Sequence, residues 1–467
     1  MTQTVPIPLW ALVLLCAFAA VTFASHFLFP SVRWFFRRRA ERMIARLNTR
    51  LKRPIQPFKL ARRSDTVNRL THDPLVAQAV LDHARTTGIP EAVAFETATR
   101  YAKEIVPGFS AVLYFSVAMR ISKWLSRSLY RVRVTGEDAA LEGVDPKATV
   151  VFVLNHRSNM DYVLVTWLAS SRTTLAYAVG EWARRWPLAP LVRALGGYFV
   201  RRRDLNPLYR KVLARYVQIA TQNGVTQAVF PEGRLSRDGA LHAPKLGILS
   251  YILDGHDPAV AQDVVFVPVA VNYERVLEDS VLIAARTTGT QAFRLRWWMV
   301  ARYLLRHLQL RLTGRFTRFG YAAVSFGRPL SLNDFLTADH DDPAAALGDA
   351  LMSRVASALP VLPAPLVCEA VLEGARDVAA VAAHIAAHGA VLEAQGHPVH
   401  SAGDTSEASA RTALRMLDVR KVLTLDGDRI VPDPDWAPVL RFYARTLPAS
   451  DPSNGRPVDK TENFTTV

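Results

Sequence analysis

Cysteine is scarce in this chain, since only Cys16 and Cys368 carry thiols among its 467 residues. Two thiols so far apart in sequence exclude a disulfide framework and fit a reducing compartment. The Gly-x-Ser-x-Gly pattern is absent, so nothing predicts the serine nucleophile of an α/β-hydrolase. No internal repeat is present either. What remains is a chain long enough to bury one large core with smaller additions.

Charged residues are missing from the first 32 residues, which contain no Lys, Arg, Asp or Glu. Residues 9–29 are almost entirely apolar and are long enough to cross a bilayer as a helix. A cleavable signal peptide begins with a positive region, which this segment lacks. We therefore expect residues 1–32 to be a retained transmembrane anchor. Arginines 37–39 follow at once, so the positive-inside rule predicts an inner (cytoplasmic) membrane protein whose remaining chain faces the cytoplasm.

Acidic residues are almost absent from residues 33–63, which contain 12 Lys or Arg but only one acid, Glu41. This segment supplies most of the formal net charge of +16. Basic charge concentrated beside an apolar segment favours anionic membrane lipid as a partner over nucleic acid, for which the charge would spread over a folded face. We expect a basic interfacial segment at residues 33–63, with a solvated basic helix as the alternative.

Two further segments are candidates for the membrane surface. Residues 105–125 form an apolar helical pattern that Pro107 and Gly108 make unsuitable for spanning, so we expect it to be interfacial or packed on the core. Residues 292–315 combine Trp and Phe with six Arg in an amphipathic pattern. A second interfacial helix is expected there, and a solvated structural helix is the alternative.

Strand and helix patterns alternate along the middle of the chain, which predicts an α/β core with a central β-sheet flanked by helices at residues 129–335. Residues 64–128 are expected to be a helical N-terminal region. Residues 336–448 are expected to be a mainly helical C-terminal region with one hairpin around Asp426-Gly427, and residues 449–467 a disordered tail. The expected strands are short apolar runs at residues 129–134, 150–154, 175–179, 196–200, 227–230, 264–271 and 321–326.

A polar cluster follows the strand at residues 150–154 and includes His156 and Asp161. A tight turn into a helix lets this carboxylate reach the imidazole. An Asp that accepts a hydrogen bond from one ring nitrogen leaves the other nitrogen free to act as a base. The spacing also arises by chance in a chain of this length, so the alternative is that Asp161 caps a helix and His156 is a hydrogen-bonded loop histidine.

The His-Asp pair has no predicted serine or cysteine nucleophile beside it, so the substrate must bring the nucleophile. His156 would then take a proton from a substrate hydroxyl as that hydroxyl attacks an activated acyl group. Residues 201–203, Arg234 and Arg237 give bidentate donors that favour a phosphate on this substrate. Gly233 allows close backbone approach in the same loop. A solvated or lipid-facing patch is the alternative for the arginines.

Four segments, in this order and spacing, resemble the four blocks of the membrane-bound glycerolipid acyltransferases. They are HRSNMDY (156–162), LGGYFVRR (195–202), FPEGRLSRDGALHAPKLGILS (230–250) and VPVAVNYERVLE (267–278). Within that superfamily they are most similar to the bacterial glycerol-3-phosphate 1-acyltransferases, as is VSFGRPLSL (324–332). That branch usually has EGGRSR where this chain has EGRLSR. Asn155 and Phe230-Pro231 are closer to the lysophosphatidate acyltransferases, so that branch stays open.

The resemblance implies roles for residues of the four blocks. His156 is implied to be the catalytic base and Asp161 its partner. The implied substrate-binding residues come from all four blocks: Arg157, Ser158, Arg201, Glu232, Gly233, Arg234, Ser236, Arg237 and Pro268. Pro268 corresponds to the fourth-block proline near the acyl-donor site.

The resemblance also implies an activity, which is acyl transfer from acyl-CoA or acyl-carrier protein to the sn-1 hydroxyl of glycerol-3-phosphate. This chemistry requires no cofactor or metal, and we expect none, since no Cys/His cluster is evident in the sequence. The nearest alternative is acylation of lysophosphatidate. A non-enzymatic membrane scaffold and a nucleic-acid-binding protein are more distant alternatives.

Overall fold

The computed structural model describes residues 8–170, 172–184, 188–201, 205–287, 305, 309, 311–313 and 318–448. The chain divides into two compact units, Met1–Ile55 and Gln56–Val467. The tail expected at residues 449–467 and most of the helix expected at residues 292–315 lie outside the described residues.

The first unit consists mainly of one helix, α1 (Leu9–Asn48). Side chains are described for only part of this helix, because those of residues 20–37 and 40 are outside the description. Among the described residues, no helix combines the length and the apolar character needed to cross a membrane. The transmembrane anchor expected at residues 1–32 therefore gains no support from the structure and partly lies outside its description.

The second unit is built on one mixed sheet whose strand order is β1-β7-β6-β2-β5-β3-β4, with β8 beside β6. Its strands are β1 (Arg131–Thr135), β2 (Thr149–Leu154), β3 (Ala176–Gly180), β4 (Gly197–Val200), β5 (Gln227–Val229), β6 (Val264–Tyr273), β7 (Tyr321–Phe326) and β8 (Leu330–Ser331). The predicted strands are thus confirmed, and so is the central sheet. Most of these strands are short runs rich in apolar residues, with Gly, Pro or polar residues at their ends, so the signal that predicts them is local.

Parallel pairing places several strand ends at one edge of the sheet. β2 pairs in parallel with β5 and β6, and β3 pairs in parallel with β5 and β4. β7 is antiparallel to β6 and parallel to the edge strand β1, which makes the sheet mixed. Because the carboxyl ends of β2, β4, β5 and β6 meet at the same rim, the polar residues that follow them are brought to one side of the molecule.

Helices cover both faces of the sheet. Val150, Phe152 and Leu154 of β2 join a buried cluster with α9 (Met160–Ala169) and the C-terminal helices. Val151 and Val153 point to the other face, where α11 (Pro207–Gln222), α12 (Gly247–Asp254) and α16 (Pro343–Ser357) pack. All six residues of β2 are buried, as expected for a central strand between two helical layers.

The N-terminal region of this unit is helical, as predicted. It contains α2 (Pro57–Leu60), α3 (Arg63–Thr71), α4 (Pro74–Thr87) and α5 (Glu91–Ile105). The Asp73 side chain caps α4 by accepting from the Leu75 N–H, and Gly88 ends that helix in the left-handed region. The helix expected at residues 105–125 begins later, because Pro107 and Gly108 interrupt it. α6 (Ala111–Leu113), a π-helical turn (Tyr114–Ala118) and α7 (Met119–Leu129) follow in one run.

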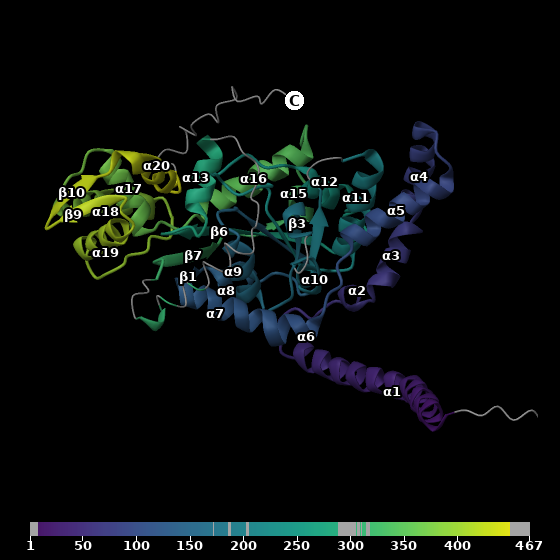
Figure 1. Ribbon diagram of the computed structural model, residues 1–467. Helices are drawn as coiled ribbons and strands as arrows, with labels where there is room; N and C mark the ends of the chain where they lie inside the picture. Colours follow the sequence, from purple (N-terminus) through teal and green to yellow (C-terminus); the bar gives the residue numbers. More distant parts are fainter. Residues whose placement is uncertain are drawn as a thin grey trace, which may run out of the picture. The chain divides into compact units, whose positions relative to one another are not determined.

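The C-terminal region is mainly helical and contains the predicted hairpin, β9 (Leu423–Asp426) with β10 (Arg429–Pro432). Its helices α17–α20 gather at one end of the sheet and α3–α5 at the other (Figure 1). The remaining helices are α8 (Glu137–Leu141), α10 (Leu188–Ala194), α13 (Asp279–Thr287), α15 (Leu332–Phe335), α17 (Pro363–Leu372), α18 (Val378–Ala394), α19 (Ser406–Val419) and α20 (Ala437–Ala444), with 3-10 turns at Glu181–Arg184 and Pro434–Trp436.

Glu274, directly after β6, makes the stability of this fold depend on pH. It is 3% exposed, and its Oε2 accepts a hydrogen bond from the Tyr321 N–H at 2.7 Å. Burial raises the pKa of this carboxyl from 4.5 to about 7. The folded protein therefore binds the proton more tightly than the unfolded chain does. The resulting stabilisation is complete below the unfolded pKa of 4.5 and is lost as the pH rises through about 7.

We expect Glu274→Gln to remove this loss, which is on the order of 3 kcal/mol. Thermal unfolding midpoints of the wild type and the variant should be compared between about pH 5 and pH 8. The difference should grow in favour of the variant as the pH rises. Burial also raises the pKa values of Glu232 and Glu278, but both proteins retain these groups, so their effects cancel. A difference that stays constant over this range would contradict the assignment.

Candidate active site

His156 and Asp161 form a buried pair where β2 ends and α9 begins. His156 Nδ1 lies 2.9 Å from Asp161 Oδ2, and the two residues are 4% and 0% exposed. The same carboxylate oxygen accepts the main-chain N–H groups of Arg157 at 2.8 Å and Ser158 at 3.0 Å. The turn thus folds around the Asp161 carboxylate, which holds the imidazole in one orientation as the spacing predicted.

Tyr273, the last residue of β6, completes the surroundings of Asp161. Its hydroxyl donates to Asp161 Oδ1 at 2.7 Å, so both carboxylate oxygens have partners. Burial and the charge of Asp161 raise the pKa of Tyr273 well above 10.0, so the hydroxyl stays protonated as a donor. This tyrosine lies in the fourth sequence block, but the sequence analysis gave it no role. Its partner Asp161 lies 112 positions earlier, and no local sequence pattern indicates a contact over that separation.

The second ring nitrogen of His156 is free to act as a base. Among the described residues, none is hydrogen-bonded to Nε2 of His156. The ring packs between Phe230, with centroids 4.4 Å apart, and Tyr162, at 5.3 Å. Neither nearby serine serves as a nucleophile for this ring, because Ser158 Oγ donates to Glu278 Oε2 at 2.7 Å and Ser236 Oγ donates to the Ala240 carbonyl at 2.8 Å.

Glu232 and Ser236 connect the loop after β5 to the histidine. Glu232 Oε1 accepts the His156 N–H at 2.8 Å, and its Oε2 accepts the His242 N–H at 3.3 Å. The Ser236 N–H donates to the His156 carbonyl at 2.9 Å. Burial raises the pKa of Glu232, partly opposed by Arg157. Both residues were predicted to bind substrate. The structure places them at the site, where their contacts position the backbone of His156.

Glu278, in the segment before α13, also fixes the turn that follows His156. Its carboxylate accepts Ser158 Oγ at 2.7 Å, and its other oxygen accepts both the main-chain and the side-chain N–H groups of Asn159, at 3.1 and 2.9 Å. Burial raises the pKa of Glu278, while these hydrogen bonds oppose the shift. Ser158, predicted to bind substrate, is therefore 0% exposed and donates to an acid that lies in the fourth sequence block but was given no role there.

Arg157 is the most unusual side chain of the site. It is 1% exposed, and none of its three guanidinium nitrogens has a hydrogen-bond partner among the described residues. Burial lowers its pKa, while the charges of Glu232, Asp161 and Asp238 raise it. A buried guanidinium without a hydrogen-bonded acceptor is costly and has donors available for an anion.

Arg201 does not join this cluster. It follows β4, three strands away from β2, which corresponds to roughly 14 Å. Its guanidinium donates to both oxygens of Glu104, at 2.8 and 2.7 Å, and this interaction raises its pKa. The rings of Tyr101 and Tyr209 flank it. Sequence could not foresee this pairing, since Glu104 lies 97 positions earlier.

The other predicted binding residues occupy different places. Arg234 is exposed and Arg237 half-buried, both in the loop that contains Glu232. Gly233 in that loop has φ of +68°, which glycine adopts without strain. Pro268 is buried inside β6 and pairs with Val153 of β2. Val153 precedes His156 by three residues along β2 and the turn that follows it. Pro268 therefore lies within the sheet and not at its rim.

The loop after β5 also contacts the C-terminal region through Asp238 and Gly239. Asp238 lies 3.0 Å from His242 Nε2 and 3.2 Å from an Arg445 guanidinium nitrogen. Burial would raise the pKa of Asp238, but His242 and Arg445 lower it overall. Gly239 has φ of +87°, and a Cβ on it would lie 1.9 Å from the Phe442 carbonyl oxygen of α20. The loop therefore has no room for a side chain at this point.

We expect Gly239→Ala to destabilise the protein by about 2 kcal/mol or more, because it adds a collision to backbone strain. Gly396→Ala is the matched control, since Gly396 has φ of +89° but open space around its Cβ position. Denaturant or thermal unfolding of the two variants separates the collision from the strain. Equal losses of stability in both variants would show that the loop does not press against α20.

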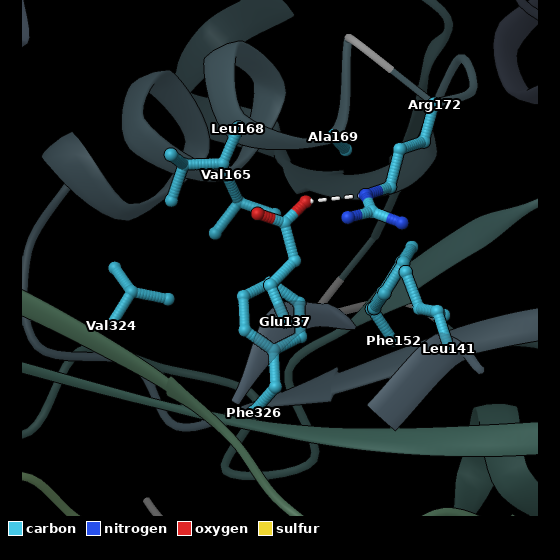
Figure 2. A pocket seen from close by; sticks show the side chains of 9 residues that line it. All are labelled: Glu137, Leu141, Phe152, Val165, Leu168, Ala169, Arg172, Val324 and Phe326. Atoms are coloured by element: carbon cyan, nitrogen blue, oxygen red, sulfur yellow. Dashed lines mark hydrogen bonds and ion pairs between the residues drawn. The ribbon is translucent and has the colours of Figure 1, made fainter. Parts of the chain in front are cut away.

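A small cavity elsewhere is not a substrate site. Figure 2 shows nine side chains around it, mostly apolar, from α8, α9, β2 and β7, with an ion pair between Glu137 and Arg172 on one side. Its volume is only ≈ 10 Å³, the size of one water molecule. An acyl chain does not fit this cavity as it stands.

Two family descriptions match this chain. Residues 131–272 match the acyltransferase family, which includes the rim with His156, Asp161 and Glu232. Residues 292–444 match the glycerol-3-phosphate acyltransferase C-terminal region, which includes α16–α20.

Several curated proteins are similar to this chain. The glycerol-3-phosphate acyltransferase of Pseudomonas entomophila is 30% identical over 282 residues, which cover 59% of this chain and 33% of that protein. The same-named protein of Shewanella loihica is 30% identical over 281 residues, covering 59% and 34%. The chain thus spans about a third of the length of these relatives.

A solved structure is also similar, the 1-acyl-sn-glycerophosphate (LPA) acyltransferase of Thermotoga maritima. It is 19% identical, covers 51% of this chain and 78% of its own, and superposes with a TM-score of 0.31. The two family matches and the curated relatives, without that structure, agree with the resemblance found in the four sequence blocks. Residues 131–272 are therefore similar to the acyltransferase family, and residues 292–444 are similar to the glycerol-3-phosphate acyltransferase C-terminal region.

Proposed function

We propose that this protein transfers a fatty acyl group from acyl-CoA or acyl-carrier protein to the sn-1 hydroxyl of glycerol-3-phosphate. The observation that supports this most strongly is the His156–Asp161 pair. One imidazole nitrogen is held at 2.9 Å from a buried carboxylate, and the other has no hydrogen-bond partner among the described residues. The hydroxyls of Ser158 and Ser236, in the described turn and loop, are engaged elsewhere, which favours an attacking hydroxyl that comes from a substrate. The names of the curated relatives supply the acceptor.

The chemistry follows from this arrangement. His156 Nε2 takes the proton of the acceptor hydroxyl as its oxygen attacks the thioester carbonyl. The tetrahedral intermediate collapses, the C–S bond breaks, and the imidazolium returns the proton to the leaving thiolate. Asp161 keeps Nδ1 protonated and balances the positive charge on the ring between these two proton transfers. No step requires a group from outside the chain and its two substrates.

The phosphate of the acceptor is assigned to Arg157, with Arg234 and Arg237 as further donors. Arg157 is buried without a hydrogen-bonded acceptor and follows His156 directly, so an anion bound by it would lie beside the base. Arg201 is a weaker candidate for phosphate binding than the sequence analysis proposed, because two nitrogens of its guanidinium already donate to the carboxylate of Glu104. Its contribution to the acceptor site would be to hold β4 and α5 together.

Association with a membrane surface is also part of the proposal, at the cytoplasmic face of the inner membrane. Val117, Ile121 and Trp124, spaced along one face of the helical run that ends in α7, are 42%, 55% and 61% exposed. Arg120, Lys123 and Arg127 alternate with them and are exposed. A face that combines large apolar side chains with basic ones suits anionic lipid headgroups.

The double variant Ile121→Ser/Trp124→Ser is expected to reduce binding to vesicles that contain anionic lipid. Sedimentation with such vesicles measures this effect, and Val260→Ser, at an exposed position of another loop, is the control. Binding that the double variant leaves unchanged would mean that this helix face does not meet the lipid.

The acceptor is tested with membranes that contain the protein, supplied with labelled palmitoyl-CoA or palmitoyl-carrier protein. Lysophosphatidate formed from glycerol-3-phosphate supports the proposal. If only added lysophosphatidate is converted, to phosphatidate, the chain is an acyltransferase of the other branch, the acceptor that Asn155 and Phe230-Pro231 suggested. Absence of transfer to both acceptors with both donors would favour a non-enzymatic scaffold.

A further inference from the structure

Two histidines and a glutamate meet in the C-terminal region, away from the rim that contains His156. Glu369 lies on α17, and His384 and His388 lie one turn apart on α18, so both imidazoles occupy the same helix face. Their side chains are 23%, 19% and 15% exposed. The cluster is therefore partly enclosed by packed helices and still open to ions from solvent.

Both imidazoles face one carboxylate oxygen. His384 Nε2 lies 2.9 Å and His388 Nδ1 2.5 Å from Glu369 Oε2, and the rings meet edge to face with centroids 5.5 Å apart. All three candidate ligand atoms lie within 4.8 Å of one another. In a tetrahedral zinc site, bonds of about 2.1 Å separate ligand atoms by about 3.4 Å. Shifts of about 1 Å or less per side chain would therefore admit an ion.

A fourth residue supports the ligand geometry. Glu373, at the end of α17, places Oε2 3.4 Å from His384 Nδ1, the ring nitrogen that faces away from Glu369. A histidine that ligates a metal usually donates its other ring N–H to a carboxylate, which fixes the tautomer and the ring orientation. His384 thus has one nitrogen directed to the common centre and the other within 3.4 Å of an outer, more exposed carboxylate.

We propose that Glu369, His384 and His388 bind a divalent transition-metal ion, with Zn²⁺ as the best match, and that Glu373 orients His384. Two imidazoles with one carboxylate form a donor set found in zinc sites, whereas Ca²⁺ and Mg²⁺ prefer oxygen ligands alone. A water molecule would complete the tetrahedral coordination on the exposed side. The ion would link α17 to α18 and so stabilise the C-terminal region.

The sequence analysis expected no metal, so this proposal departs from that expectation. The His-x3-His spacing at residues 384–388 is visible in the sequence, but its third ligand lies 15 positions before the first histidine on another helix. This inference does not depend on the proposed acyl transfer, because binding is measured without any substrate.

The test uses the full chain, stripped with a chelator and titrated with Zn²⁺ by calorimetry and with Co²⁺ by absorption spectroscopy. We expect one ion per chain, the visible bands of tetrahedral Co²⁺, and a higher unfolding midpoint when Zn²⁺ is present. Affinity should fall as the pH drops and protons compete for the imidazoles. The double variant His384→Gln/His388→Gln should lose the ion, whereas His83→Gln on α4 should bind it like the wild type.

Glu373→Gln provides a milder test if the double variant fails to fold. It should weaken binding about tenfold or more, because it removes only the outer carboxylate. The proposal is overturned if the wild type binds no ion under these conditions. It is equally overturned if the variants bind as tightly as the wild type, since the ion would then be held elsewhere.

Discussion

His156→Ala is expected to lower the rate of acyl transfer by roughly 10²- to 10⁴-fold or more, the usual contribution of a positioned general base. The substitution removes Nε2 of His156, the nitrogen that we propose accepts the proton of the attacking hydroxyl. Asp161 keeps its contacts with the N–H groups of Arg157 and Ser158 and with Tyr273, so the turn has reason to stay folded. The measurement is initial rate with saturating acyl donor and varied glycerol-3-phosphate.

The control for this variant is His83→Ala, on α4 and outside the acyltransferase-family region. It should retain full activity. Equal thermal unfolding midpoints of His156→Ala and the wild type would establish that the fold survives. A folded His156→Ala protein with undiminished transfer would exclude the histidine as the base and leave it a hydrogen-bonded loop residue.

The strands and the polar turn could be predicted from sequence because their causes are local. β2 is a mainly apolar run from Thr149 to Leu154, and the polar residues 155–159 follow it directly in the sequence. The His156–Asp161 contact spans only five positions, so a turn into α9 brings the two together. The same holds for the Asp426-Gly427 hairpin.

The partners of the predicted binding residues could not be foreseen, because they come from distant parts of the chain. Arg201 looked like a free phosphate donor until folding placed Glu104 against both arms of its fork. Ser158 was predicted to bind substrate, but in the structure its hydroxyl donates to Glu278, 120 positions later in the sequence. Four blocks of sequence identify which strand ends meet, but hydrogen bonds between those ends depend on register and burial in the folded sheet.

Asp161→Asn is expected to lower the rate by a similar factor while leaving stability almost unchanged. An asparagine can place its single carbonyl oxygen where Oδ2 now accepts from His156, Arg157 and Ser158. Its amide group then faces Tyr273, whose hydroxyl oxygen can accept instead of donating. The hydrogen-bonded turn survives this change, but the negative charge that balances the imidazolium is lost. Activity and the thermal unfolding midpoint are measured on the same preparation.

The two roles considered for Asp161, charged partner of His156 and helix cap, predict different results for this variant. If the residue only caps the start of a helix, an amide oxygen accepts the same N–H groups, and both rate and stability should stay near the wild type. Asp377→Asn is the matched control, since Asp377 caps α18 by accepting the Ala380 N–H at 2.8 Å. It should leave transfer intact. Loss of transfer in Asp161→Asn at an unchanged midpoint separates the charge from the cap, because only a charged partner favours the protonated imidazole formed during catalysis.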